Sequence, residues 1–188
     1  MGLFDGIKRR MAQSGFKREF KNYVRAGKVY NMDEARSVTI LYYLDNEETF
    51  SIIKKYVKYL KEEEGIKRVM AIGYYDGDEK NVPEYISPKL EFDFIVKHVH
   101  AKSGKPAGNI VKNFIEQDYD ILLDLTYDKK LPLMYMLNWS AARFKVGVHQ
   151  EENLKFYDLN IIQHNKSLTD LIDNINSILK KINKPHVA

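Results

Sequence analysis

Hydrophobic residues along the chain form short continuous runs, separated by segments in which apolar residues have helical spacing. Most runs are rich in Val, Ile and Tyr, which is typical of strands buried on both faces of a sheet. They predict strands at residues 37–44, 68–75, 92–96, 120–125, 143–148 and 156–162. Apolar residues three or four positions apart predict helices at residues 46–64, 110–115, 132–141 and 168–182.

The ends of the predicted helices carry recognisable start signals. Asp45, followed by Glu48, resembles a capping box, and Ser167 is placed to cap the last helix. Pro132 suits a first helical turn. Alternating strands and helices indicate an α/β fold: a doubly wound, mainly parallel, Rossmann-like sheet of five or six strands. The link before residues 156–162 is too short for a helical crossover, so we expect this strand to be antiparallel or an edge strand.

A separate amphipathic segment precedes the first predicted strand. Leu3, Ile7 and Met11 have helical spacing, which Gly15 interrupts. The spacing resumes with Phe16, Phe20, Tyr23 and Val24. Gly27 is a possible C-cap. The pattern predicts one broken helix or two short ones. We therefore divide the chain into a basic helical arm, residues 1–30, and a Rossmann-like domain, residues 31–188.

Charge is unevenly distributed between these two parts. Residues 1–37 hold nine Lys and Arg against four Asp and Glu, a balance of +5, whereas the remaining residues balance at −1. The net charge of the protein, +4, therefore comes from its N-terminal segment. A basic arm on a nearly neutral body attracts anions locally without making the whole body a nucleic-acid-binding surface.

Three interpretations of the arm are open. Its apolar side can pack on the body and leave the cations in water, or it can lie on an anionic membrane as basic amphipathic helices do. It can also bind RNA phosphates. A protein partner of residues 1–28 is a further alternative. The candidate residues for binding an anionic surface or a partner are Lys8, Arg9, Arg10, Lys17, Arg18, Lys21 and Arg25.

Several common functional motifs are missing from the sequence. It contains no G-x-G-x-x-G after the first strand, no P-loop and no G-x-S-x-G, which argues against ordinary dinucleotide enzymes, P-loop NTPases and α/β-hydrolases. The chain has no cysteine, no apolar run long enough to span a bilayer and no secretory signal pattern. We expect a cytoplasmic protein, either free, peripheral to a membrane or part of a ribonucleoprotein.

Polar residues follow several predicted strands. In doubly wound folds, ligands bind beyond the carboxyl ends of the strands, where the strand order reverses. Asp45, Asp124, Thr126 and His149 follow strands and are candidate ligand-binding residues, suited to a sugar, nucleotide or phosphate. His98 and His100 alternate but lack a third ligand, so we expect no metal site. We also expect no cofactor.

Long stretches of the chain resemble a family of uncharacterised small bacterial proteins, a domain of unknown function. The similarity includes the basic N-terminal helix and the segments "LDNEETFSIIKKYVKYL", "EFDFIV", "DYDILLDLTYDKKLPLMYMLNWSAARFKVG" and "LTDLIDNINSIL". More remotely, residues 121–147 are similar to the N-terminal half of lipopolysaccharide heptosyltransferases, with Asp124, Ala141, Arg143 and Gly147 aligned. The resemblance implies a shared Rossmann-like fold.

The sequence favours a non-catalytic binding or accessory module that docks through its basic N-terminal helix. The docking target is an anionic surface or a protein or RNA partner. The alternative is an enzyme or sensor for a nucleotide, sugar or phosphate, built on a glycosyltransferase-like half-domain. Fold similarity alone does not decide between them, because one fold hosts many functions.

Overall fold

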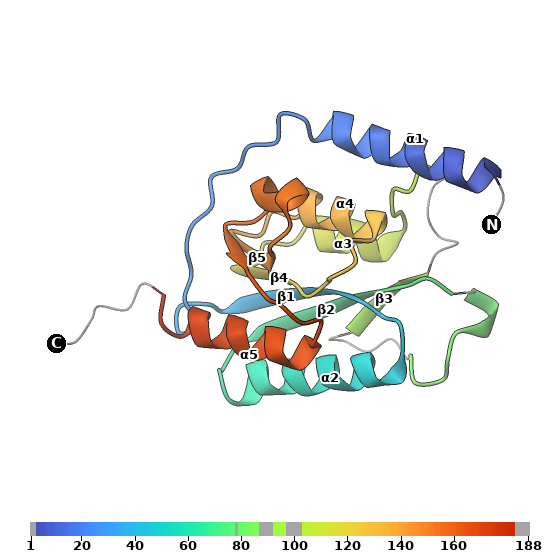
Figure 1. The fold of residues 1–188 in the computed structure, drawn as a ribbon. Helices are drawn as coiled ribbons and strands as arrows, with labels where there is room; N and C mark the ends of the chain where they lie inside the picture. Colours follow the sequence, from blue (N-terminus) through green and yellow to red (C-terminus); the bar gives the residue numbers. More distant parts are fainter. Residues whose placement is uncertain (1–2, 78, 87–91, 97–102, 183–188) are drawn as a thin grey trace.

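A computed structural model describes residues 3–77, 79–86, 92–96 and 103–182 (Figure 1). The strands are β1 (Ser37–Tyr43), β2 (Arg68–Tyr75), β3 (Phe92–Val96), β4 (Ile121–Asp124), β5 (Phe144–Val148) and β6 (Leu159–Ile161). The α-helices are α1 (Leu3–Glu19), α2 (Glu47–Glu62), α3 (Asn109–Ile115), α4 (Leu131–Trp139) and α5 (Leu168–Leu179). Two short 3₁₀ helices are η1 (Glu79–Asn81) and η3 (Glu151–Phe156).

The six strands form one sheet in the order β3-β2-β1-β4-β5-β6, and every neighbouring pair is parallel. Val38 of β1 lies in register with Val69 on one side and Ile121 on the other. The chain winds outward from β1 in both directions, so the strand order reverses between β1 and β4. This arrangement is the doubly wound, Rossmann-like fold that the hydrophobic pattern predicts.

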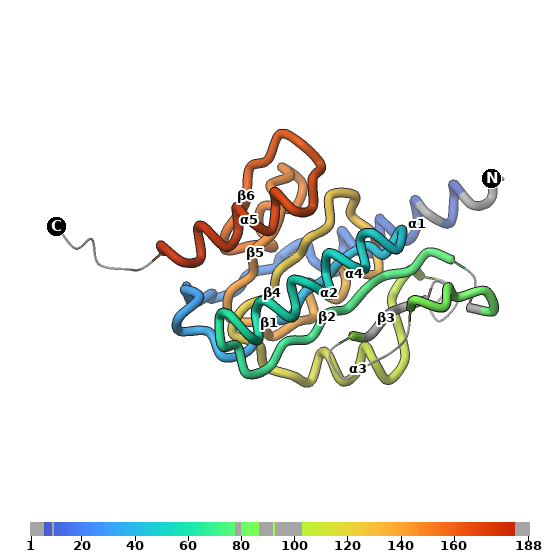
Figure 2. The backbone as a smooth tube through the Cα atoms, turned by 90° about the horizontal axis from the view of Figure 1, so that it is seen from below, coloured from blue at the N-terminus to red at the C-terminus, as the bar shows by residue number. Residues whose placement is uncertain are grey.

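Helices cover both faces of the sheet (Figures 1 and 2). α2 and α5 lie on one face, and their apolar sides share a core with residues such as Ile40 and Leu123. α3 and α4 lie on the other face, over Leu41 and Leu122. Consecutive residues of β1 and β4 thus point into opposite cores, which explains why these strands are uninterrupted apolar runs.

α1 forms an additional layer outside α4 and α3 (Figure 1). It is one unbroken helix that runs through Gly15, so the predicted interruption there is wrong, and it ends at Glu19 rather than near Gly27. A glycine within a helix costs about 1 kcal/mol relative to alanine. Burial of the neighbouring Phe16 side chain against the body offsets this cost.

Two further details differ from the sequence-based expectations. β6 is an edge strand, as one alternative had it, but it is parallel to β5. The link between the two strands crosses over through η3, which buries Phe156, so a full α-helix is not needed. The cap of α2 is Asn46, whose side chain accepts from the N–H of Thr49, rather than the neighbouring Asp45.

Candidate functional site

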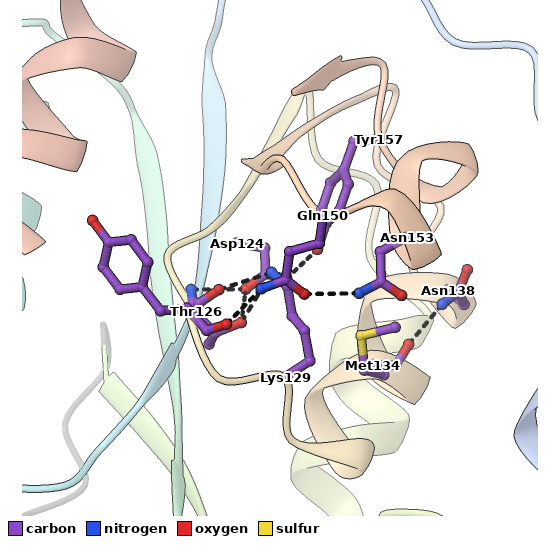
Figure 3. Close-up of polar contacts among 9 residues, drawn as sticks. Asp124, Thr126, Lys129, Met134, Asn138, Gln150, Asn153 and Tyr157 are labelled. Carbon is purple, nitrogen blue, oxygen red and sulfur yellow. Dashed lines mark hydrogen bonds and ion pairs between the residues drawn. The ribbon is translucent and has the colours of Figure 1, made fainter. Parts of the chain in front are cut away.

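Asp124 lies at the carboxyl end of β4, and its carboxylate is enclosed by four hydrogen-bond donors (Figure 3). Oδ1 accepts from the Thr126 N–H at 3.0 Å and from the Thr126 hydroxyl at 2.5 Å. Oδ2 accepts from Lys129 Nζ at 3.0 Å and from the Tyr157 hydroxyl at 2.5 Å. The Asp124 and Lys129 side chains are only 2% and 9% exposed. We call these four residues the Asp124 cluster; its charges and hydrogen-bonding groups satisfy one another.

Gly147 completes the packing of this cluster. It lies in register with Asp124 on the neighbouring strand, and the Tyr157 ring covers it so closely that a Cβ there would overlap the ring. Burial raises the pKa of Tyr157, and the negative charge of Asp124 raises it further, so the hydroxyl stays protonated and donates. The placement of Asp124 beside Gly147 is therefore accounted for by packing.

Amide side chains continue the polar cluster toward α4 and η3 (Figure 3). Gln150 donates to the Tyr127 carbonyl at 2.6 Å and accepts from Asn153 Nδ2 at 3.1 Å. Asn138 donates to the carbonyl of Met134 at 2.8 Å, and its buried Oδ1 has no partner among the described residues. The Gln150 bond ties the turn after β4 to the start of η3, whereas the Asn138 bond lies within α4, so both have a structural role.

The other two predicted ligand residues lie in exposed positions. Asp45 follows β1 and accepts from the Thr49 hydroxyl at 2.6 Å, at the start of α2. His149 follows β5 and uses its backbone N–H to bond Ile161 on β6. The structure therefore places Asp124 at the last position of a parallel strand and Asp45, Thr126 and His149 shortly after such strands. It buries Asp124 and Thr126 together, and it joins neither Asp45 nor His149 to them by a hydrogen bond.

Sequence reasoning missed Lys130 and Tyr43, which meet where the strand order reverses. Lys130 Nζ lies 4.0 Å from the centroid of the Tyr43 ring, a cation–π contact between the start of α4 and the end of β1. Tyr74 lies next to Tyr43, with ring centroids 6.2 Å apart. The available signal was a lysine two residues before the helix predicted at 132–141, in the link that follows a predicted strand.

An open surface pocket lies at the opposite edge of the sheet. Its lining includes Arg68, at the start of β2, and Asp118, shortly before β4, so it lies at the amino ends of the strands. Ligands of doubly wound folds bind at the carboxyl ends. The position of this pocket thus gives no support to the predicted ligand site.

The inner side of α1 is fixed to the body by aromatic and polar contacts. Phe16 is buried, and its ring meets Tyr135 of α4 edge-on, with centroids 5.0 Å apart. At the end of the helix, Glu19 forms an ion pair with Lys105 at 2.6 Å and accepts from Trp139 Nε1 at 3.4 Å. The interpretation in which the arm packs on the body is therefore correct for this side of the helix.

Residues 20–28, which we call the strap, continue this attachment after α1 ends. Lys155 Nζ donates to the Phe20 carbonyl at 2.5 Å. Arg25 forms an ion pair with Asp158 and donates to the carbonyl of Ala142 at 2.5 Å. Gly27 approaches Asp158 so closely that a Cβ would overlap its carboxylate. Arg25, one of the predicted surface-binding cations, thus has both terminal guanidinium nitrogens bonded within the protein.

A lysine is buried beneath the strap. Lys145 of β5 is 1% exposed, and its Nζ donates to the Leu137 carbonyl at 2.6 Å and to the Tyr23 hydroxyl at 3.0 Å. Burial lowers its pKa to about 7; the positive charge of Arg25 also lowers it, against the opposing effect of Asp158. The strap therefore seals an amine that is easily deprotonated.

The opposite side of α1 is exposed, and we call it the outward surface. It carries Ile7, which is 50% exposed, and Met11, which is 70% exposed. Its exposed cations are Lys8, Arg10, Lys17, Arg18 and, two residues after the end of the helix, Lys21. No ion pair joins these five side chains to any other residue in the described part of the chain. Arg9 lies in the same helix, but its side chain is outside the described part.

Comparison with known proteins places the whole arrangement in one family. Residues 8–182 match the model of a family of unknown function, DUF6913. The chain belongs to the DUF6913 family. No curated protein and no solved structure matches it. The DUF6913 match starts within α1 and continues to the end of α5, so the arm and the sheet are both part of what the family shares.

The structure also bears on metal and membrane sites in this DUF6913 chain. Among the described residues, no group of three or more His, Asp or Glu side chains is placed to hold a metal ion. His98 and His100 lie outside those residues. Within the same ranges, every helix is too short or too polar to cross a bilayer. The predicted site residues that are exposed are the cations of the outward surface, together with Asp45 and His149 at the carboxyl edge of the sheet.

Proposed function

We propose that the chain is a non-catalytic docking module, which attaches to an anionic surface or partner through the outward surface of α1. One observation carries the proposal: exposed cations that have no ion-pair partner among the described residues lie along a helix whose inner side is fixed to the body. A helix held in this way presents its charges in a fixed direction. Binding an anion then does not require the helix to be ordered first.

The distribution of charge supports the same direction of docking. The +5 of residues 1–37 lies on a body that balances at −1. Attraction to an anionic surface is therefore strongest at the arm, which orients the protein as it approaches. Glu19, the acidic residue next to Arg18 in α1, forms its ion pair with Lys105 and not with the outward cations.

Salt elution from immobilised heparin, a general polyanion, tests the proposal. We expect the variant Lys17→Gln with Arg18→Gln to elute at clearly lower salt than the wild type, because both cations are exposed on the outward surface. The matched control is Lys54→Gln with Lys55→Gln, an adjacent exposed pair on α2, across the sheet. Equal shifts in both variants would contradict docking through α1.

Deletion of the arm is a poor substitute for these substitutions. Removing residues 1–28 would expose the apolar surface under Phe16 and uncover Lys145. The truncated protein would lose stability as well as the cations, so lost binding could not be attributed to charge. Substitution of exposed side chains leaves the strap and the inner side of α1 intact.

A second candidate function is binding of a nucleotide, sugar or phosphate at the carboxyl edge of the sheet. Lys130 over the Tyr43 ring, at the point where the strand order reverses, favours it. The heptosyltransferase resemblance proposed from the sequence belongs to this candidate, although no curated protein matches the chain. A thermal-shift screen with nucleotides and nucleotide sugars tests it: we expect a saturable rise in Tm that is lost in Lys130→Ala or His149→Ala. No shift with any of these ligands would rule the candidate out.

A further inference from the structure

The outward surface of α1 combines two kinds of side chain that need different surroundings. Ile7 and Met11 lie one turn apart, are half or more exposed, and contact water with their aliphatic atoms. Arg10, Lys17 and Arg18 are exposed around them. A purely ionic partner would leave these two apolar side chains in water, so burial of their surface would not contribute to binding.

The aromatic rings of the arm are turned toward the body. Phe16 and Phe20 are buried, and Tyr23 contacts the Phe156 ring, with centroids 5.5 Å apart, while its hydroxyl accepts from Lys145. Proteins that bind single-stranded nucleic acids commonly stack bases on exposed rings. No such ring is exposed among the described side chains of the arm, so its geometry favours a partner that takes aliphatic groups.

We infer that the anionic surface is a lipid bilayer with anionic headgroups, on which α1 lies flat with its outward surface toward the lipid. This inference rests on the proposed function and specifies its target. Ile7 and Met11 enter the boundary between headgroups and acyl chains, while the cations contact lipid phosphates and carboxylates. The contacts of Phe16 and Glu19 with the body hold the helix axis parallel to the membrane plane.

Both kinds of side chain are expected to contribute measurably to binding. Loss of one cation near an anionic membrane should weaken binding about fivefold. Replacing one exposed aliphatic residue by glutamine should weaken it by roughly fivefold to tenfold, because less apolar area leaves water. An attachment that depends on a few such contributions is reversible and sensitive to salt.

Co-sedimentation of the full chain with vesicles tests the inference. The vesicles contain equal parts of phosphatidylcholine and phosphatidylserine, and pure phosphatidylcholine vesicles serve as the uncharged reference. The informative variant is Met11→Gln, and its matched control is Ile162→Gln, because the two side chains are 70% and 68% exposed. The cation variant Lys17→Gln with Arg18→Gln and its α2 control complete the set. Circular dichroism verifies that each variant is folded.

We expect binding to the anionic vesicles only, weakened by Met11→Gln and by the cation variant but by neither control. If heparin binding depends on α1 but vesicle binding does not occur, the lipid target is wrong and the docking function stands. If binding to vesicles is lowered by the cation variant but unchanged in Met11→Gln, insertion of the apolar residues is wrong. If the chain binds neither heparin nor the anionic vesicles, both proposals fail.

Discussion

The Asp124 cluster and the outward surface of α1 both carry charged side chains, which are buried and paired in the first and exposed in the second. In the cluster, a carboxylate at 2% exposure meets four donors, and its lysine is almost as deeply buried. On the outward surface, five cations lie in water with no ion-pair partner among the described residues. A polar group whose bonds are all made within the protein contributes to the fold, whereas one without partners is available for binding. Substitutions should therefore affect stability in the first region and binding in the second.

The largest expected effect is a loss of stability in Asp124→Ala. Removing the carboxylate leaves Lys129 as a buried charge and Tyr157 as a donor without its acceptor, which typically costs about 3–5 kcal/mol. Chemical denaturation measures the free energy of unfolding. The control Asp128→Ala removes an exposed ion pair with Lys166 and should cost less than about 1 kcal/mol. Similar costs for both would show that the cluster is not a structural unit.

Gly147→Ala should have the next largest effect on the free energy of unfolding. The added methyl group overlaps the Tyr157 ring, which must move away from Asp124, at a cost of about 1–3 kcal/mol. Gly15→Ala, within α1, meets no atom within 4 Å and should instead stabilise the protein slightly. A neutral Gly147→Ala would mean that the ring can be displaced freely, contrary to the packing described above.

Lys145 should make stability depend on pH above neutrality. Its pKa is about 7 in the folded chain and about 10.5 when unfolded, so between these values the unfolded chain holds the extra proton. Stability therefore rises with pH across this window, with a slope of at most about 1.4 kcal/mol per pH unit. Denaturation at several pH values between 7 and 9.5 measures the slope, which should be reduced in Lys145→Met. An unchanged slope in that variant would assign the titration to another group.

The smallest effect on stability is expected from the outward surface. The combined variant Lys8→Gln, Arg10→Gln, Lys17→Gln and Arg18→Gln removes exposed charges that form no ion pair within the described part of the chain. The free energy of unfolding should therefore change by no more than about 0.5 kcal/mol. The same denaturation measurement applies. A cost of several kcal/mol would show that these cations stabilise the fold, as the Asp124 cluster does.

The regular elements were predictable because their signals are local. The apolar run of β1 and the stripe of α5 depend only on neighbouring residues, and both elements lie close to their predicted ranges. The continuity of α1 through Gly15 was not predictable, because it depends on burial of Phe16 against Tyr135, far along the chain. The direction of β6 likewise depends on how η3 packs.

The position of the candidate site was predictable from the sequence, but the burial of its carboxylate was not. The pattern correctly places Asp124 at the carboxyl end of a parallel strand. Whether such a carboxylate faces a ligand or is enclosed depends on Lys129 and Tyr157, and Tyr157 is brought in by a different element. The basic arm was predicted from composition, whereas the engagement of Arg25 with Asp158 required the folded structure.

The most direct test of docking through α1 uses a single cysteine as a probe, because the chain has none of its own. Ser14→Cys, on the outward surface, and Ser51→Cys, on α2, are both exposed and each can carry an environment-sensitive dye. Titration with heparin and with anionic vesicles should change the emission of the dye at position 14 and leave that at position 51 unchanged. A change at position 51 alone, or at neither position, would contradict docking through this helix.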